Sequence, residues 1–251
     1  MYNFLVVIFT NNMSEKFAHK GDEKKKYVKQ MFNDISIHYD RLNLLSSFGI
    51  DRYWRNMLVK EIPLSSHDVL LDVATGTGDV ALAFYVKYKV NVVGVDIADK
   101  MIDIANQKAQ KYKTSKLTFS IEDAESMSFD DNKFSALTIS FGFRNMGFYD
   151  KALSEFYRVL QNKGKIAILE FSNPKSRWFS PIFKFYFKNI VPLLGSLFTR
   201  KDAYMYLPES VDYFLTREEV CSKMNSAGFS NIVFKDMTFG VATIYTGVKD
   251  E

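Results

Sequence analysis

The sequence predicts an α/β protein whose mostly parallel, seven-stranded sheet is covered by helices on both faces. Short, continuously apolar runs alternate with amphipathic helical patterns between about residues 69 and 171, and such runs are typical of buried parallel strands. The last part of the chain differs, because two strand-like runs, around Val233 and at Val241–Tyr245, follow each other after a short gap. These two runs predict an antiparallel hairpin at the end of the sheet.

The same patterns place the individual elements in chain order. Helical patterns at residues 28–32 and 53–58 precede the first strand. A helix over residues 217–227 leads into the closing hairpin. The central strands are expected at residues 69–73, 92–96, 117–120, 136–140 and 165–171, with helices at 79–88, 100–111 and 151–160.

The length of 251 residues gives room for one full α/β domain but not for two of ordinary size. We expect residues 1–23 to form a flexible leader, residues 24–251 a single domain, and the charged stretch from Lys16 to Lys29 to be solvated. The apolar start is shorter than the roughly 18 residues of a membrane span and lacks the basic flank of a signal peptide. This start is therefore either a disordered leader or lies before the true start codon, and we favour translation from Met13.

Charge and composition exclude several classes of protein. The formal net charge of +4 is compatible with an anionic membrane surface or an acidic partner, but it is too mild to indicate nucleic-acid binding. The single cysteine, Cys221, excludes an intramolecular disulfide and favours a reducing, cytoplasmic compartment. His19, His38 and His67 lack the spacing of metal ligands, so we expect no metal site.

The strongest local motif is a glycine-containing turn between the first strand and the helix that follows it. Gly76 and Gly78 lie in this turn, where glycines let the backbone approach a ligand and the helix N-terminus offers unpaired N–H groups. Asp96 ends the next strand, and a carboxylate there can accept hydrogen bonds from ribose hydroxyls. Taken alone, the pattern also fits an NAD-binding fingerprint.

Two further acidic positions distinguish between these cofactors. Asp72, just before the turn, is poorly placed for a pyrophosphate but suits the ammonium and sulfonium groups of S-adenosylmethionine; alternatively, it caps the loop. Asp123, with the neighbouring backbone N–H of Ala124, could hold the adenine edge, unless this stretch is a solvated acidic turn. Ligands of open α/β sheets bind outside the carboxyl ends of the strands. Three acids at successive strand ends therefore predict one site.

Segments spread over the whole chain carry a resemblance to a known family. The most specific are Ser140–Asn145 and Tyr204–Val211, and the others are 39–43, 48–55, 72–79, 157–164, 169–174, 227–229 and 240–249. From about Lys24 to Lys249 the chain resembles the quinone-biosynthesis C-methyltransferases of the menaquinone and ubiquinone pathways. It departs from their pattern at Phe143 and at residues 161–163, and the first dozen residues have no counterpart.

The resemblance implies a Rossmann-like, class I S-adenosylmethionine-dependent methyltransferase that methylates a ring carbon of a polyprenylated quinol. The appearance of residues 46–52 favours demethylmenaquinol, and the corresponding benzoquinol of ubiquinone biosynthesis, or both quinols, is the alternative. The resemblance also implies how the site residues divide between substrate and cofactor. Arg144 and Asn145 would face the substrate, whereas the cofactor would contact Asp72, Thr75, Gly76, Gly78, Asp96, Asp123, Ala124 and Ser140.

Methyl transfer from a sulfonium to carbon is an in-line displacement, so the protein mainly aligns the reactants and excludes water. The ring carbon becomes a good nucleophile as its hydroquinone oxygen, with a pKa near about 10, loses a proton. Because an arginine stays protonated, we expect Arg144 to stabilise the phenolate, with Asn145 as an orienting donor. Alternatively, Arg144 is structural and binds carbonyl groups or Asp123. The sequence does not identify the proton acceptor.

An aromatic insertion at about residues 174–207 follows the fifth strand. Lys184, Lys188 and two prolines interrupt it, which argues against a transmembrane helix. We expect a lid over an apolar substrate that makes transient contact with the inner face of a membrane. Core packing or a homodimer interface would explain the same composition.

Two other classes of protein compete with the methyltransferase. A nicotinamide-dependent oxidoreductase could use the same glycine turn, but Asp72 and the lack of a suitably placed Tyr-Lys pair disfavour it. A non-catalytic scaffold of a quinone-synthesis complex could retain the fold, but the intact cofactor loop with Asp96 and Asp123 disfavours that.

Overall fold

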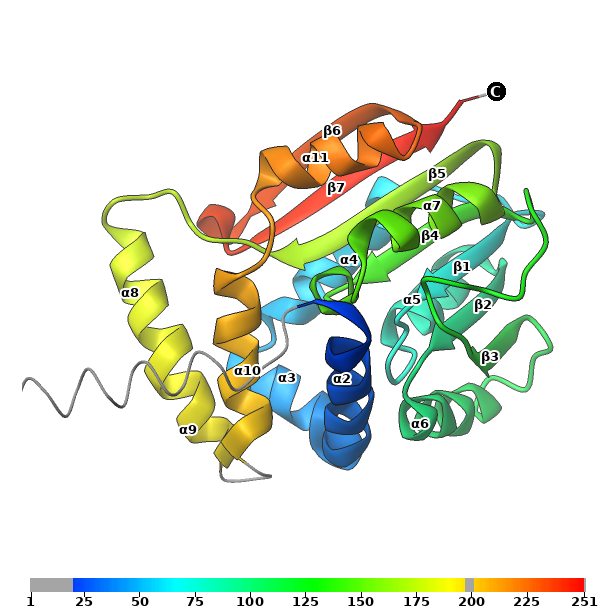
Figure 1. Cartoon of the computed structure of the whole chain (residues 1–251). Helices are drawn as coiled ribbons and strands as arrows, with labels where there is room; N and C mark the ends of the chain where they lie inside the picture. The colour runs from blue at the N-terminus through cyan, green and yellow to red at the C-terminus, as the bar shows by residue number, and fades with distance from the viewer. Residues whose placement is uncertain (1–19, 197–200, 251) are drawn as a thin grey trace, which may run out of the picture.

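The computed structural model describes residues 20–196 and 201–250, and Figure 1 shows one sheet with the strand order β3-β2-β1-β4-β5-β7-β6. The first five strands pair in parallel, and β7 pairs antiparallel with both β5 and β6. This arrangement confirms the predicted fold class. Met13 and most of the predicted leader lie outside the described residues. The strands are β1 (Val69–Val73), β2 (Asn91–Asp96), β3 (Leu117–Ile121), β4 (Phe134–Ser140), β5 (Leu160–Phe171), β6 (Phe229–Met237) and β7 (Ala242–Lys249).

Helices cover both faces of the sheet, and the strands feed an apolar core on each side. Successive side chains of a strand point to opposite faces, so on β5 Ile166 and Ile168 join the core under α7 and α11. Ala167 and Leu169 join the core under α4 and α5 on the other face. The helices around the sheet are α4 (Ile50–Glu61), α5 (Asp79–Tyr88), α6 (Asp99–Gln110), α7 (Tyr149–Val159) and α11 (Arg217–Ser226).

The fifth strand begins earlier than the sequence predicts. Instead of a loop before residue 165, β5 continues directly from α7, and its register with β4 shifts between Phe134 and Ala136. Lys163 has a φ of 63° within this irregular stretch. A Cβ at Gly164 would lie 2.7 Å from the carbonyl oxygen of Gln161. The polar, glycine-containing residues thus form a bulged strand start, which resembles a loop in sequence.

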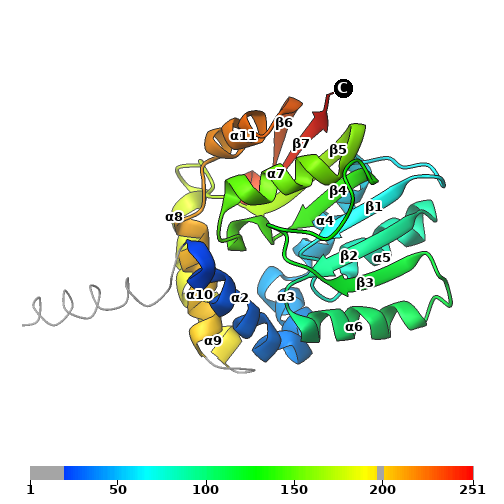
Figure 2. The same cartoon turned by 45° about the vertical axis from the view of Figure 1, so that its right-hand side comes forward.

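The remaining helices gather beside the carboxyl ends of β4 and β5, as Figures 1 and 2 show. They come from the segment before β1 and from the insertion after β5, which are distant in sequence. Within the described ranges, no helix has the length and apolarity to cross a bilayer. These elements are α2 (Gly21–Ile35), η1 (Ser36–His38), α3 (Tyr39–Ser47), α8 (Phe179–Phe185), the π-helical turn η3 (Tyr186–Ile190), α9 (Val191–Ser196) and α10 (Lys201–Asp212).

In its described part, from Lys20 to Lys29, the charged segment is not simply solvated, so that expectation was wrong there. Helix α2 begins at Gly21, inside the predicted leader, and the side chain of Lys24 is only 4% exposed. Its ammonium group donates a hydrogen bond of 2.7 Å to the carbonyl oxygen of Arg144. Burial, together with the nearby Arg144 charge, lowers the pKa of Lys24 to about 8. A buried carbonyl acceptor thus takes the place of water.

Candidate functional site

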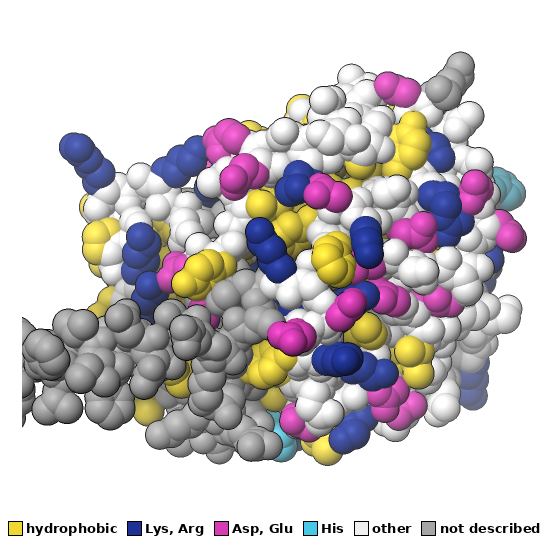
Figure 3. Space-filling view, in the orientation of Figure 1, with side chains coloured by type: hydrophobic (Ala, Val, Ile, Leu, Met, Phe, Trp, Pro, Cys, Tyr) yellow, Lys and Arg dark blue, Asp and Glu magenta, His cyan; other side chains and the backbone are white. Residues whose placement is uncertain are grey.

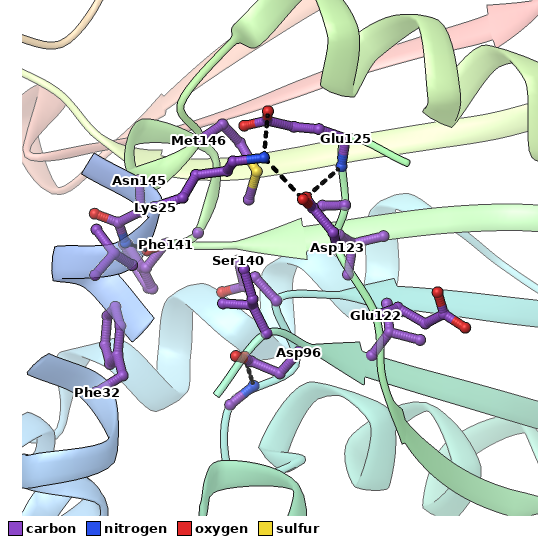
Figure 4. A pocket seen from close by; sticks show the side chains of 18 of the residues that line it. Lys25, Phe32, Asp96, Glu122, Asp123, Glu125, Ser140, Phe141, Asn145 and Met146 are labelled. Carbon is purple, nitrogen blue, oxygen red and sulfur yellow. Dashed lines mark hydrogen bonds and ion pairs between the residues drawn. The ribbon is translucent and has the colours of Figure 1, made fainter. Parts of the chain in front are cut away.

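A cavity opens beyond the carboxyl ends of β1, β2 and β4, beside the point where the strand order reverses around β1. Ligands of open α/β sheets bind at such a point. Figure 4 shows that the side chains around the cavity come from the ends of β2 and β4, from the acidic turn after β3 and from α2. Of the predicted cofactor residues, five line it: Gly76, Asp96, Asp123, Ala124 and Ser140.

The turn after β1 needs its two glycines for different reasons. Gly76 has a φ of 56° and lines the cavity, where a side chain would project toward Tyr39. Gly78 has a φ of 85°, and a Cβ there would lie only 3.1 Å from the ring of Phe119. Gly78 does not line the cavity. It instead lets α5 begin close to the sheet, in a left-handed conformation that glycine adopts without steric cost.

Asp96, at the end of β2, holds the glycine turn and faces the cavity. Its Oδ2 accepts the backbone N–H of Gly76 at 2.8 Å, and its Oδ1 accepts that of Ala98 at 2.9 Å. Burial raises the pKa of Asp96, and these amide hydrogen bonds partly offset that effect. A carboxylate has about four acceptor positions, so Asp96 retains capacity for two ribose hydroxyls.

Asp123 forms part of an ion-pair cluster at the opposite wall (Figure 4). Lys25 of α2 lies 2.8 Å from its Oδ2 and 3.3 Å from Oε2 of Glu125, whose other oxygen accepts the backbone N–H of Gly147. Burial disfavours the Lys25 ammonium, but the hydrogen bond that it donates to Asp123 and the charge of Glu125 outweigh this effect and raise the pKa of Lys25. The acidic turn is therefore not simply solvated: α2 is anchored to it.

Asp72 lies under the glycine turn and does not line the cavity, although the sequence predicts a contact with the cofactor. It is 1% exposed, and its two oxygens accept hydrogen bonds from the hydroxyls of Thr75 at 2.6 Å and Thr138 at 2.7 Å. Burial raises the pKa of Asp72 to about 6, despite these hydrogen bonds. This geometry fits the alternative interpretation, in which Asp72 caps the loop. Thr75, another predicted cofactor residue, is the loop residue whose hydroxyl donates to Asp72.

Polar groups of the cavity wall that have unused hydrogen-bonding capacity match the polar groups of S-adenosylmethionine. Ser140 Oγ is buried and lacks a hydrogen-bond partner in the described part of the chain, and buried hydroxyl groups normally have one. Asp96 offers free acceptor positions for ribose, and Ala124 lines the wall expected to face adenine. These polar groups stand among Val28, Phe32 and Val95, which are apolar. An amphipathic nucleoside needs this combination.

A second cavity of about 410 Å³ adjoins the first, and the two share Phe32, Tyr39 and Phe141 as wall residues. Helices α2, α3, α4 and α8 enclose it together with η3, and its walls are mostly aromatic and aliphatic. Residues before β1 and residues of the insertion thus meet in one apolar chamber beside the cofactor cavity. Its apolar lining includes Met31, Ile35, Phe48, Ile50, Trp54, Phe171, Phe179, Ile182, Phe183, Phe187, Val191, Leu207 and Val241.

The two predicted catalytic residues, Arg144 and Asn145, lie between these cavities. Arg144 lines the second cavity, is 6% exposed, and pairs with the fully buried Glu170 at 3.0 Å. Its guanidinium group also donates to the carbonyl oxygen of Phe141. Asn145 lines the cofactor cavity and accepts a hydrogen bond of 3.1 Å from the hydroxyl of Tyr206. Arg144 thus has the structural partners that the alternative predicted, but its acidic partner is Glu170, and Asp123 pairs with Lys25 instead.

Sequence reasoning assigned no role to several residues that build the site. Lys25, Phe32 and Tyr39 come from α2 and α3, and each lines the cofactor cavity. Tyr39 belongs to a segment that resembles the quinone methyltransferases, which was the only available signal. Asp51 and Arg55 line the apolar cavity. They belong to residues 48–55, another segment that resembles the quinone methyltransferases.

Comparison with solved structures identifies the fold. The chain superposes on a structure from Thermotoga maritima, a "SAM-dependent methyltransferase, possible histamine N-methyltransferase", with a TM-score of 0.63. The superposition covers 88% of this chain and 99% of that chain at 18% identity. The fold is that of the class I S-adenosylmethionine-dependent methyltransferases, and S-adenosylmethionine is the cofactor that the sequence predicted.

The chain belongs to the ubiE/COQ5 methyltransferase family, whose model matches residues 20–249. It is 45% identical to the "Ubiquinone/menaquinone biosynthesis C-methyltransferase UbiE" of Geobacter sulfurreducens, over 90% of each chain. It is 39% identical to the "Demethylmenaquinone methyltransferase" of Bacteroides fragilis, over 95% of this chain and 100% of that protein. The family inferred from sequence resemblance is thereby confirmed.

Asp72→Asn should alter how stability depends on pH. The pKa of Asp72 is raised from 3.8 to about 6 in the folded protein. Between these two pH values the folded state keeps a proton that the unfolded chain releases. The stability of the wild type should therefore fall as the pH rises through this range. Between pH 4 and 7, urea denaturation should show Asp72→Asn gaining about 2 kcal/mol relative to wild type.

Asp68→Asn provides a control of opposite sign for this experiment. Burial opposes ionisation of Asp68, but hydrogen bonds from Ser65 outweigh it and lower the pKa of the carboxyl group. The carboxylate therefore stabilises the fold above its unfolded pKa, and this stabilisation is lost as the pH falls. Asp68→Asn should lose stability relative to wild type as the pH rises. Parallel pH profiles for wild type and Asp72→Asn would contradict the assigned environment of Asp72.

Lys25→Ala should weaken S-adenosylmethionine binding, because it removes the link between α2 and the Asp123 wall. We expect the Kd from isothermal titration to rise by roughly tenfold, about 1.4 kcal/mol. Lys29→Ala is the matched control, because Lys29 lies one turn further along α2. Its Nζ is 3.9 Å from Oδ1 of Asp99, and this long ion pair is largely exposed. Equal Kd values for the two variants would show that the Lys25 cluster does not shape the cofactor cavity.

Proposed function

We propose that this protein transfers the methyl group of S-adenosylmethionine to a ring carbon of a polyprenylated quinol, with demethylmenaquinol as the preferred substrate. The observation that carries the proposal is the apolar cavity of about 410 Å³, joined to the cofactor cavity by a shared aromatic wall. A quinol ring there would lie beside the cofactor's methyl group. The names of the Geobacter and Bacteroides relatives support the same substrates, including the benzoquinol of ubiquinone biosynthesis.

The residues around the cavity suit methylation at carbon. When bound, S-adenosylmethionine supplies an electrophilic methyl group on a positively charged sulfur atom. The aromatic walls exclude water and hold the ring in line with that group. Arg144 places a permanent positive charge at the cavity wall, which favours the phenolate of the quinol. Its pairing with Glu170 and with the Phe141 carbonyl keeps the guanidinium group in place.

The outer part of the apolar cavity suits contact with a membrane surface. Phe48 is 77% exposed and Ile182 is 61% exposed, yet both also line the cavity. Phe185 and the basic residue Lys184 are exposed on the same helix, α8. In Figure 3, hydrophobic and basic side chains lie next to each other over the region of α8. A polyprenyl tail could therefore pass from the bilayer into the cavity without crossing water.

Binding and methyl transfer together test the proposed function. We expect isothermal titration to show micromolar affinity for S-adenosylmethionine and S-adenosylhomocysteine, and none for NAD. Under anaerobic conditions, labelled methyl should be transferred to a prenylated 1,4-naphthoquinol faster than to the corresponding benzoquinol. Binding of NAD alone would indicate the oxidoreductase alternative. Cofactor binding without transfer to either quinol would exclude the proposed substrates, and binding of no ligand would favour the scaffold.

The double variant Phe48→Asn/Ile182→Gln should bind lipid vesicles less tightly, because it removes two apolar side chains from the cavity entrance. We expect at least a tenfold loss in a flotation assay with equal parts phosphatidylglycerol and phosphatidylcholine. Val233→Ser is the control, since Val233 is 62% exposed on β6 and does not line the cavity. Unchanged binding by the double variant would exclude this entrance as the membrane contact.

A further inference from the structure

A single carboxylate stands in the wall of the apolar cavity. Asp51 is 7% exposed, and among the described residues it is the only acidic side chain that lines this cavity. It lies in the first turn of α4, after a sharp turn in which Phe48 and Gly49 both have positive φ. This turn directs the start of α4 toward the cavity. A carboxylate in an apolar chamber is costly unless it has partners.

The partners of Asp51 hold it in place without using its full capacity. Ser47 Oγ donates to Oδ1 at 2.6 Å, and Nη1 of Arg55 lies 3.3 Å from Oδ2. The same Arg55 nitrogen is closer to Asp79, at 2.8 Å, so its charge is shared between two acids. Because a carboxylate has about four acceptor positions, Asp51 can still accept a hydrogen bond from a ligand in the cavity.

The other ionisable groups that line the cavity cannot take a proton from a phenol. Arg55 and Arg144 remain protonated at any pH near neutrality. Tyr39, Tyr186 and Tyr206 also line the cavity, and burial raises the pKa of each, so all three keep their hydroxyl protons. The remaining polar residues there, including Asn43 and Thr238, are not bases. Asp51 is left as the only described group in the cavity wall that can accept a proton.

We propose that Asp51 is the catalytic base, accepting a hydrogen bond from a hydroxyl of the quinol and taking its proton as the ring carbon attacks the methyl group. This assignment rests on the proposed function. As the new carbon–carbon bond forms, the methyl–sulfur bond breaks and its electron pair stays on sulfur, giving the neutral thioether. The ring carbon then loses its own hydrogen as a proton to solvent, and Asp51 returns the first proton to the oxygen. One proton is released overall.

Substitution of Asp51 tests the assignment through the pH dependence of the rate. Asp51→Asn should reduce kcat at pH 7 by about 10²- to 10³-fold and leave the Kd for S-adenosylmethionine unchanged. The defect should shrink as the pH approaches the pKa of the quinol, near about 10, because hydroxide then forms the phenolate. Asp51→Glu, which keeps a carboxylate, should recover part of the rate. The assay uses the anaerobic prenylated naphthoquinol and the full chain.

Asp236→Asn is the matched control, because it also removes a carboxylate that pairs with an arginine. Asp236 pairs with Arg217 at 2.6 Å, and neither residue lines the cofactor cavity or the apolar cavity. We expect this variant to keep kcat within about twofold of wild type, whatever its stability. A loss of rate as large as that of Asp51→Asn would mean that disruption of an ion pair, and not loss of a base, slows the reaction.

A second variant keeps the test valid if Asp51→Asn fails to fold. Ser47→Ala removes the hydrogen bond that holds the Asp51 carboxylate in the cavity wall, so kcat should fall by roughly tenfold while KM and the Kd for S-adenosylmethionine stay unchanged. An unchanged kcat in Ser47→Ala, or a defect in Asp51→Asn that is equal at every pH, would overturn the assignment. If wild-type protein methylates neither quinol, the proposed function itself fails. If wild type is active and Asp51→Asn retains its kcat, only the role of Asp51 fails.

Discussion

The buried ion pair between Arg144 and Glu170 organises the region in which both cavities meet. Glu170 is completely buried near the end of β5, and it accepts hydrogen bonds from the backbone and the guanidinium group of Arg144. Breaking a buried pair of this kind costs about 3–5 kcal/mol, because the remaining charge has no compensation. The turn after β4 is therefore tied to β5, and it presents Arg144 to one cavity and Asn145 to the other.

Helix α2 and helix α10 complete the site through contacts to this turn and to the acidic turn after β3. Lys24 donates to the carbonyl oxygen of Arg144, and Lys25 pairs with Asp123 and Glu125. Tyr206, from α10, reaches Asn145. Two segments far apart in sequence thus close over the carboxyl ends of the strands, where they form an apolar chamber with a few fixed polar groups. A chamber of this composition favours alignment and exclusion of water over acid–base chemistry in solvent.

Much of the fold could be predicted because its signals are local. Apolar strands, amphipathic helices and the glycine turn each occupy a short stretch, and the order of strands and helices restricts the topology. The position of Asp96 was equally local, because a residue that ends a parallel strand must lie at the ligand-binding edge. The contacts of the Asp72 side chain could not be predicted in this way. Its place in sequence was informative, but its side chain points to Thr138 of the neighbouring strand and does not reach the cavity.

The sequence by itself determined the class I fold, the family and the strand ends where a nucleoside would bind, because these depend on periodicity and on short motifs. Only the tertiary structure decided which charges are partners. Asp123 pairs with Lys25, 98 residues away, and Arg144 pairs with Glu170 across neighbouring strands. It also brought α3, α4 and α8 around one apolar cavity that contains Asp51. Such contacts depend on how helices pack at the sheet edge, and the sequence pattern of a single segment does not predict that packing.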